Sequence, residues 1–332
     1  MSSVLNGPIT AIVVVIGVLL NFFTIFTLLR TRRHPRVRRR SEGTSVTPRC
    51  SPHPVIHIYF FWIACTDSAL LISALLMYCL PALLDKSFDA YVRFFPTCYM
   101  LSNATLTASV WLMCAMMYDR YEALCRPLRQ HLSYCATTNP TRRIHIICAT
   151  ILLLGLIYTL PRLFELTVVS VNNTLRVEQT SLVRNRLYMI GYRIVGALFF
   201  YSLLPYVILS FITARVSYAL HHASRKRTTI SKYSHRTLQH RSSDSERILM
   251  AIMTKFLISR LLPTALDITE HIIGQEDFLF SATITIIVDI CDLIVVLASA
   301  SNFFIYCIFS RSFRCTLNSQ FSFNYSSSKT IP

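Results

Sequence analysis

The chain has 332 residues, of which 53% are hydrophobic and 15% charged, with a formal net charge of +17. Its mean hydropathy is +0.48. A soluble domain of this length carries far more charge, so these values exclude an ordinary soluble protein. The positive charge raises nucleic acid as a partner. However, the basic residues alternate with long apolar blocks instead of forming one face, which favours a polytopic membrane protein that binds no nucleic acid.

Seven apolar blocks are each near the length of about 20 residues that a membrane-spanning helix needs. We therefore expect an all-α membrane protein, a seven-transmembrane-helix bundle that forms a single domain over residues 1–332. Residues 1–7 precede the first helix and residues 310–332 form the tail. The expected helices cover residues 8–29, 54–80, 95–118, 144–168, 188–213, 248–272 and 279–309.

Lysine and arginine orient these helices in the membrane. They concentrate in the connections 30–53, 119–143 and 214–247 and in the tail. Because such residues favour the cytoplasmic side, we expect a plasma-membrane protein with its tail inside and its N-terminus outside. The first and third of these connections also fit attraction to anionic lipid, with phosphorylation or partner docking as the alternative.

Two modification sites follow from this orientation. The sequon Asn172-Asn173-Thr174 falls outside, so Asn172 is a candidate glycosylation site. Cys315 lies at the cytoplasmic edge, where palmitoylation would anchor the segment, and an unmodified thiol is the alternative. Most of the 11 cysteines fall in spans or on the cytoplasmic side, where thiols stay reduced, so they do not form a disulfide framework.

Polar side chains at membrane depth are costly and indicate a function or a bond between helices. Asp67 lies in the middle of the second span, at about the depth of Asn21 in the first, and Asn302 lies within the seventh. We expect these three residues to form one internal cluster able to hold water or a small cation. At the cytoplasmic edge of the third span stands Asp119-Arg120-Tyr121, for which an ordinary interfacial charge pair is the simpler interpretation.

Taken together, the seven spans, the outside N-terminus and Asp119-Arg120-Tyr121 resemble a rhodopsin-like (class A) G-protein-coupled receptor. Asn21 in "GVLLNFF" resembles the first-helix asparagine of that family, and Asp67 resembles the second-helix aspartate of its sodium site. "NFFIY" resembles the seventh-helix Asn-Pro-x-x-Tyr, and "SRSFRCTL" the short amphipathic helix after it. Ser109 and Ser299 resemble the serine partners of that aspartate. Pro205 and Pro263 resemble the prolines that kink the fifth and sixth helices.

A narrower resemblance is to invertebrate FMRFamide and myosuppressin-type neuropeptide receptors. It rests on four segments: "TASVWLM" (107–113), "YTLPRLFEL" (158–166), "FLISRLLPTALDITE" (256–270) and the proline-free "NFFIY". The chain also departs from the wider family. Phe303 stands where proline is usual, and the sixth helix lacks the usual tryptophan. No cysteine lies between 161 and 195, so the usual bridge to the second outer loop cannot form. A Cys79–Cys98 pair is the open alternative.

The resemblance implies a mechanism in which an extracellular agonist opens the cytoplasmic face to a heterotrimeric G protein. An agonist can shift the equilibrium between the closed and open states only if it binds one of them more tightly than the other. Arg120 would pair with Asp119 when inactive and then be released to the partner, and Tyr306 would swing inward. Asp67 and its neighbours would hold sodium and water and collapse on activation. Arrestin and a receptor kinase are further implied partners, besides the lipid bilayer.

An amidated Arg-Phe peptide would need carboxylates for its guanidinium and apolar walls for its ring. The ligand-binding candidates near the outer ends of the helices are Glu270, Asp267, Asp289, Asp292, Glu165 and Trp111. Simpler alternatives stay open: an ion pair between Glu165 and Arg162, solvation of Asp267 and Glu270, and packing of Trp111.

Other functions are weighed against this one. A chemosensory receptor for small molecules is the alternative in the same fold, favoured by the short N-terminal segment and the missing outer-loop cysteine. A transporter or channel would need internal repeats or a continuous polar path, and the sequence has neither. An enzyme or metal site would need a nucleophile–base set or a ligand cluster, whereas His34, His53 and His57 are scattered.

Overall fold

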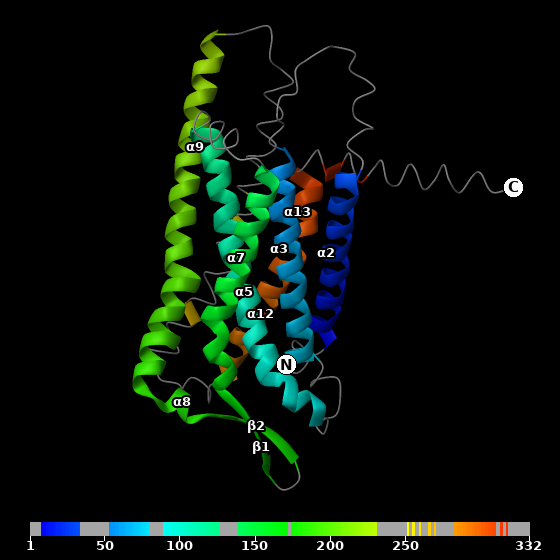
Figure 1. Cartoon of the computed structure of the whole chain (residues 1–332), viewed down its shortest axis with the longest axis vertical. Helices are drawn as coiled ribbons and strands as arrows, with labels where there is room; N and C mark the ends of the chain where they lie inside the picture. Colours follow the sequence, from blue (N-terminus) through cyan, green and yellow to red (C-terminus); the bar gives the residue numbers. More distant parts are fainter. Residues whose placement is uncertain are drawn as a thin grey trace, which may run out of the picture.

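The computed structural model describes residues 8–33, 53–79, 89–126, 139–171, 174–230 and 282–309, with single positions between 251 and 269 and between 313 and 317. In this part the long helices run side by side as an elongated bundle, with one β-hairpin at one end (Figure 1). We call this the hairpin end, and the opposite end, which carries Arg120, the Arg120 end.

The helices are mostly α-helical, with short π- or 3₁₀-helical stretches labelled η. In chain order they are α2 (Thr10–Arg33), α3 (His53–Ala74) with η3 (Leu75–Cys79), α5 (Asp89–Cys125), α7 (Pro140–Thr159) with η4 (Leu160–Phe164), α8 (Ser181–Arg184), η5 (Tyr188–Gly196), η6 (Leu198–Leu203), α9 (Leu204–Ile230), α12 (Ala282–Ala300) and α13 (Asn302–Phe309). The hairpin pairs β1 (Leu166–Val171) antiparallel with β2 (Thr174–Gln179), and Leu166 lies opposite Gln179.

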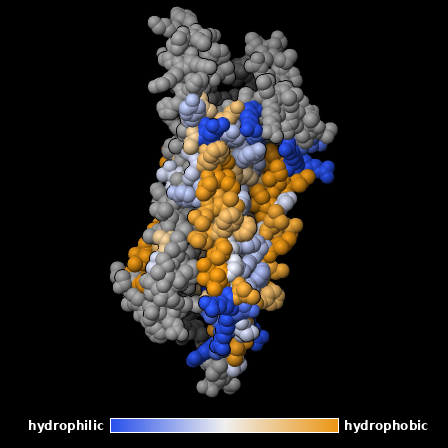
Figure 2. All heavy atoms as spheres, turned by 90° about the vertical axis from the view of Figure 1, so that its left-hand side faces the viewer, coloured by the Kyte–Doolittle hydropathy of each residue, from blue (hydrophilic) through white to orange (hydrophobic). Residues whose placement is uncertain are grey.

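The helices have the length and composition of membrane spans. Five of them, within the described residues, can cross a bilayer, and the bent pair α12–α13 makes a sixth. Large apolar side chains face outward, for example Phe22, Leu153 and Phe211 at 66%, 57% and 61% exposure. Figure 2 shows apolar side chains over the middle of the bundle and polar ones gathered towards its ends. Such a surface suits lipid, so the chain is a multi-pass membrane protein.

The sixth expected span, 248–272, lies mostly outside the described residues. Its described positions, among them Thr254, Lys255 and Ser259, are helical. We call this stretch the sixth segment. Two helices, by contrast, extend beyond the apolar blocks that predict them: α5 has 37 residues, and the helix that begins at Tyr188 continues through α9 to Ile230. Hydropathy marks only the part of a helix that lies in hydrocarbon, so polar continuations beyond the membrane surface escape it.

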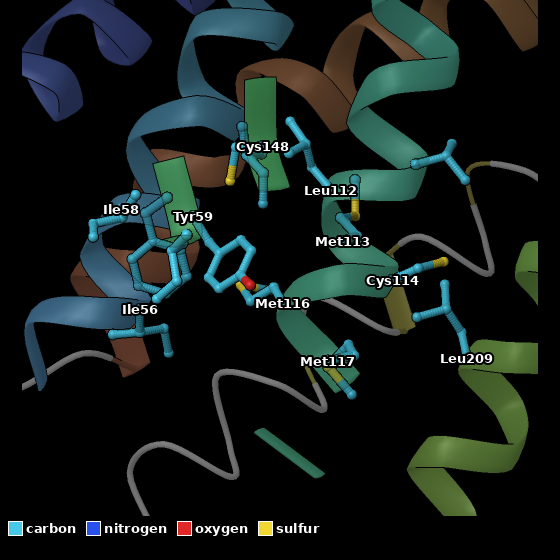
Figure 3. Packing of buried hydrophobic residues seen from close by; sticks show 14 of the residues in the cluster. Ile56, Ile58, Tyr59, Leu112, Met113, Cys114, Met116, Met117, Cys148 and Leu209 are labelled. Carbon is cyan, nitrogen blue, oxygen red and sulfur yellow. The ribbon is translucent and has the colours of Figure 1, made fainter. Parts of the chain in front are cut away.

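The main hydrophobic core lies towards the Arg120 end, where α3, α5, α7 and α9 meet. Leu112, Met116 and Met117 of α5 and Ile58 and Phe60 of α3 belong to one cluster, and each of these side chains is almost fully buried. Figure 3 shows Tyr59 of α3 pointing towards Met116 of α5, with Cys148 between α3 and Leu112 and with Leu209 at the edge. The unbranched methionines fill the irregular space between helices, so this core fixes α5 against its neighbours.

The last span bends although it lacks the proline of related receptors. The axes of α12 and α13 differ by 44°, and the break falls at Ser301. The Ser301 hydroxyl donates to the carbonyl oxygen of Ala298 at 2.9 Å. Serine hydroxyls that bond back to the preceding turn bend helices. The bend therefore lies at Ser301, whose hydroxyl bonds back into α12, and not at a proline.

Pro205, a predicted helix kink, lies next to a change of helix type. The chain from Tyr188 to Leu203 is largely π-helical and becomes α-helical at Leu204, one residue before the proline. Proline has no N–H, so the carbonyl one turn earlier loses its partner and the ladder is interrupted. Pro263, the other predicted kink, lies outside the described residues.

Candidate functional site

The helices bring the predicted polar residues together in the middle of the bundle. Each is at most 5% exposed, and we call them the polar cluster: Asn21, Asp67, Ser109, Ser299 and Asn302. The Ser109 hydroxyl donates to one carboxylate oxygen of Asp67 at 2.9 Å, and the Asn302 amide donates to the other. Asn21 donates to the backbone oxygen of Ser299 at 3.2 Å. Ser299 therefore contributes its carbonyl to this contact.

A residue that sequence reasoning missed completes the polar cluster. The ammonium of Lys255, in the sixth segment, donates to the side-chain oxygen of Asn302. Lysine is a donor only, so the amide oxygen of Asn302 faces Lys255 and its NH₂ faces Asp67. The available signal was a charged lysine at membrane depth, because such a residue needs a partner there.

The sodium ion implied by the resemblance can be tested against this geometry. Hard cations take oxygen ligands. Both oxygens of Asp67 accept hydrogen bonds from the protein, and the oxygen of Asn302 accepts from Lys255. An ion among these oxygens would also stand beside a positive charge. The residues of the polar cluster therefore do not fit a bound sodium ion.

At the Arg120 end, the predicted charge pair is formed within one helix. The guanidinium of Arg120 lies 2.9 Å from the carboxylate of Asp119, and their side chains are 10% and 16% exposed. Tyr121 packs against the main core. On the next turn, Arg126 lies 3.9 Å from Glu122 and stacks over the ring of Tyr121 at 5.9 Å. The Asp119–Arg120 pair is the more shielded of the two, so its attraction is less screened by solvent.

Tyr306 lies deep in an aromatic cluster. It is 1% exposed, and its ring centroid lies 4.2 Å from that of Phe60 on α3 and 6.0 Å from that of Phe313. Phe313 and Arg314 are helical, in the region where the amphipathic helix is expected. Arg314 donates to the carbonyls of Cys307 and Ile308, at the end of α13. A cation at these carbonyls stabilises the helix terminus.

At the hairpin end, Arg162 holds three elements together. Its guanidinium donates to the Tyr99 hydroxyl at 3.2 Å and to the Asn103 side-chain oxygen at 2.9 Å, both on α5. It also stacks over the ring of Tyr201 in η6 at 5.5 Å. Arg162 is only 9% exposed. Sequence reasoning offered Arg162 only as a partner for Glu165, and the neighbouring "LPRLFE" gives no sign of these distant partners.

Glu165 is buried at 2% exposure and accepts a hydrogen bond from the Tyr188 hydroxyl at 2.9 Å. Among the described ion pairs within 4.0 Å, none joins Glu165 to Arg162, although the two charges interact at longer range. The Glu165 backbone accepts from the Thr180 N–H at 2.9 Å, which fastens β2 to the end of η4. These bonds secure the base of the hairpin without a disulfide, and Cys98 is a free thiol, so it forms no bridge to Cys79.

Three of the other predicted ligand contacts lie within the described residues: Asp289, Asp292 and Trp111. Asp289 is buried and Asp292 partly buried, three residues apart on α12 and so on neighbouring parts of one face. Asp289 precedes Ser299 by ten residues, about 15 Å along the helix towards the hairpin end. Trp111 instead packs against the main core. The ligand candidates Asp267 and Glu270 lie outside the described residues, as do the glycosylation candidate Asn172 and the palmitoylation candidate Cys315.

Comparison with known proteins gives a consistent result. The family described as "7 transmembrane receptor (rhodopsin family)" matches residues 44–306. The chain is 22% identical to the FMRFamide receptor of Drosophila melanogaster over 93% of its own length and 52% of that protein. It is 24% identical to the FMRFamide peptide receptor frpr-18 of Caenorhabditis elegans, over 70% of this chain and 53% of that protein.

A third relative is the probable G-protein coupled receptor frpr-1 of C. elegans, 22% identical over 79% of this chain and 69% of that protein. The chain spans about half the length of the first two relatives. The family match, however, covers most of the chain and includes the polar cluster residues Asp67, Ser109 and Asn302. The chain therefore belongs to the rhodopsin family of seven-transmembrane receptors.

Proposed function

We propose that this chain is a G-protein-coupled receptor for an extracellular FMRFamide-like neuropeptide. The observation that carries the proposal is the similarity to the Drosophila FMRFamide receptor, which extends over 93% of the chain. The Asp119–Arg120 pair and the buried polar cluster give further support, because they are a charge pair and a polar network that a change in helix packing can rearrange.

In this proposal the hairpin end faces the outside of the cell and the Arg120 end faces the cytoplasm. The basic connections and tail support that orientation, since lysine and arginine favour the cytoplasmic side. The plasma membrane is the proposed location. Asn172, which falls between β1 and β2 in the sequence, would then be on the side where glycosylation takes place, and Cys315 on the side where palmitoylation takes place.

Activation would begin with an agonist that binds the open state better than the closed one. Arg120 would leave Asp119 and contact a heterotrimeric G protein, while Tyr306 would leave Phe60 and turn inward. The present contacts of both residues support a closed starting state. Arrestin and a receptor kinase are proposed as later partners of the same cytoplasmic face.

For the ligand, Asp292 and Asp289 are the proposed partners of a peptide guanidinium. They lie on α12, on the hairpin side of the polar cluster, and a carboxylate in a partly buried setting pairs strongly with arginine. Asp267 and Glu270 are further candidates. Glu165 already accepts from Tyr188, so it would have to exchange that bond for a ligand contact, and Trp111 would act only through packing.

The test is G-protein activation in cells that express the chain, measured against a panel of Arg-Phe-amide peptides. We expect a dose-dependent response to at least one amidated peptide and none to its free-acid form. A chain that reaches the cell surface, ignores every peptide and responds to small odorants would be a chemosensory receptor. That result would overturn the proposal.

The ligand contact is tested with Asp292→Asn. The variant should lower the potency of an Arg-containing peptide about tenfold or more, since a charged hydrogen-bonded pair contributes roughly 1.5–3 kcal/mol. The matched control is a peptide in which citrulline replaces arginine. It should be weak on both receptors, with no further loss on Asp292→Asn. Equal loss for both peptides would show a general effect of the substitution.

A further inference from the structure

We propose that Lys255 supplies the cation of the polar cluster, in place of the bound sodium ion that the resemblance implies. The carboxylate of Asp67 is 2% exposed, and a buried charge of this kind needs a counter-charge and hydrogen bonds. The ammonium of Lys255 reaches it through one amide, that of Asn302. The counter-charge is therefore a covalent part of the chain.

The hydrogen bonds have a fixed direction. Lys255 donates to the oxygen of Asn302, and the nitrogen of Asn302 donates to Asp67. Ser109 donates to the second carboxylate oxygen. Ser109 and Asn302 thus donate directly to Asp67, and Lys255 donates to the amide of Asn302. A sodium ion would need the same oxygens as ligands, so it would compete with the donors that now point at them.

Charge leads to the same conclusion. Asp67 and Lys255 together have no net charge, so the polar cluster gives little attraction for a second cation. The ammonium would also repel an ion bound to Asp67, and repulsion is strong at a site shielded from water. Competition for the oxygens and repulsion by the ammonium of Lys255 therefore both disfavour a sodium ion at Asp67.

The ammonium of Lys255 differs from a free ion because it is covalently attached to the chain. A sodium ion can leave the bundle while the helices stay in place, whereas Lys255 can leave Asn302 only if the sixth segment or its side chain moves. A movement of the sixth segment that carries Lys255 away from Asn302 would therefore also remove the counter-charge of Asp67. In this way Lys255 joins the sixth segment to α13 and, through Asn302, to α3.

The test is thermal unfolding of the purified full-length receptor in sodium chloride and in choline chloride at equal ionic strength. The wild type should differ by less than about 1 °C between the two salts. Lys255→Met removes the ammonium and keeps an unbranched side chain of similar length. It should unfold at a lower temperature in choline and recover by several degrees in sodium, because the vacated position takes the ion. The control Lys255→Met with Asp67→Asn should lose that recovery.

Two results would overturn the proposal. The first is a wild type that sodium stabilises by several degrees and whose gain Asp67→Asn abolishes, because the ion then binds although Lys255 is present. The second is a folded Lys255→Met receptor with no sodium response, because no cation position was then freed. If Lys255→Met does not fold, the comparison of wild type with Asp67→Asn in both salts still decides the question.

Discussion

Asn302 donates a hydrogen bond to Asp67, a residue 235 positions earlier in the chain. The bond ties the first residue of α13 to the middle of α3, and both side chains are 2% exposed. Because the other end of the same amide accepts from Lys255, one side chain connects α3, α13 and the sixth segment. The stability of the bundle should therefore be unusually sensitive to position 302.

The first prediction concerns Asn302→Ala. The substitution removes a donor from Asp67 and the acceptor that Asn302 offers to Lys255, and we expect it to lower the free energy of unfolding by about 2–4 kcal/mol. Thermal unfolding of the purified receptor measures the change. Phe304→Leu is the control on the same helix, because Phe304 is 52% exposed and faces outward. A common melting temperature for wild type and Asn302→Ala would contradict the role of the bond.

The polar cluster was predictable because each member is a polar residue at a similar depth in an apolar span. Depth follows from counting along a helix, and carboxylates or amides in hydrocarbon have few partners to choose from. Asp67 and Asn302 could thus be paired without any knowledge of how the helices pack. The class of the fold was predictable for a similar reason, since the hydropathy profile is read directly from the order of residues in the sequence.

The contacts of Lys255 and Arg162 were not predictable in the same way. Lys255 had been noted only as a charge inside its span, and its choice of Asn302 depends on how the sixth segment is rotated. Arg162 had a carboxylate three residues away, yet it bonds to residues about 60 positions earlier. The bend at Ser301 was not predictable because proline is the usual signal of a kink and Phe303 stands in its place.

The second prediction concerns the charge pair at the Arg120 end. Asp119→Asn leaves the guanidinium of Arg120 without its neighbouring carboxylate, 2.9 Å away in the wild type. Under the proposed mechanism the closed state loses that attraction, so agonist-free G-protein activation should rise several-fold, which corresponds to about 1 kcal/mol. A cell-based G-protein assay, normalised to surface expression, measures it.

Glu122→Gln is the matched control for that experiment. It also removes a carboxylate next to an arginine on α5, but Arg126 is 49% exposed and the separation is 3.9 Å. An exposed pair of this kind contributes little, so basal activity should stay at the wild-type level. An equal rise in both variants would mean that charge alone, and not release of Arg120, controls the closed state.

The third prediction concerns the hairpin end. Arg162→Met should destabilise the receptor by about 2–4 kcal/mol, because the buried acceptors on Tyr99 and Asn103 lose a charged donor. Hydrogen exchange at the base of the hairpin should become faster, since the backbone of Arg162 accepts from Glu165, which in turn accepts from Thr180. Arg176→Met is the control, because Arg176 lies exposed on β2. Unchanged exchange in Arg162→Met would show that the hairpin is held independently of this arginine.

The fourth prediction concerns the close approach of α2 to α12. A Cβ added at Gly17 would lie 2.7 Å from the Cβ of Ala300 and 2.9 Å from a methyl of Leu71. Gly17→Ala should therefore cost about 1–3 kcal/mol by pushing the helices apart, which thermal unfolding measures. Adding Ala300→Gly removes the closer of the two contacts and should restore most of the loss. Gly191→Ala, where an added Cβ meets no atom within 4 Å, should leave the melting temperature unchanged or slightly higher. If the double variant were no more stable than Gly17→Ala alone, the contact with Ala300 would not be what limits the side chain at position 17.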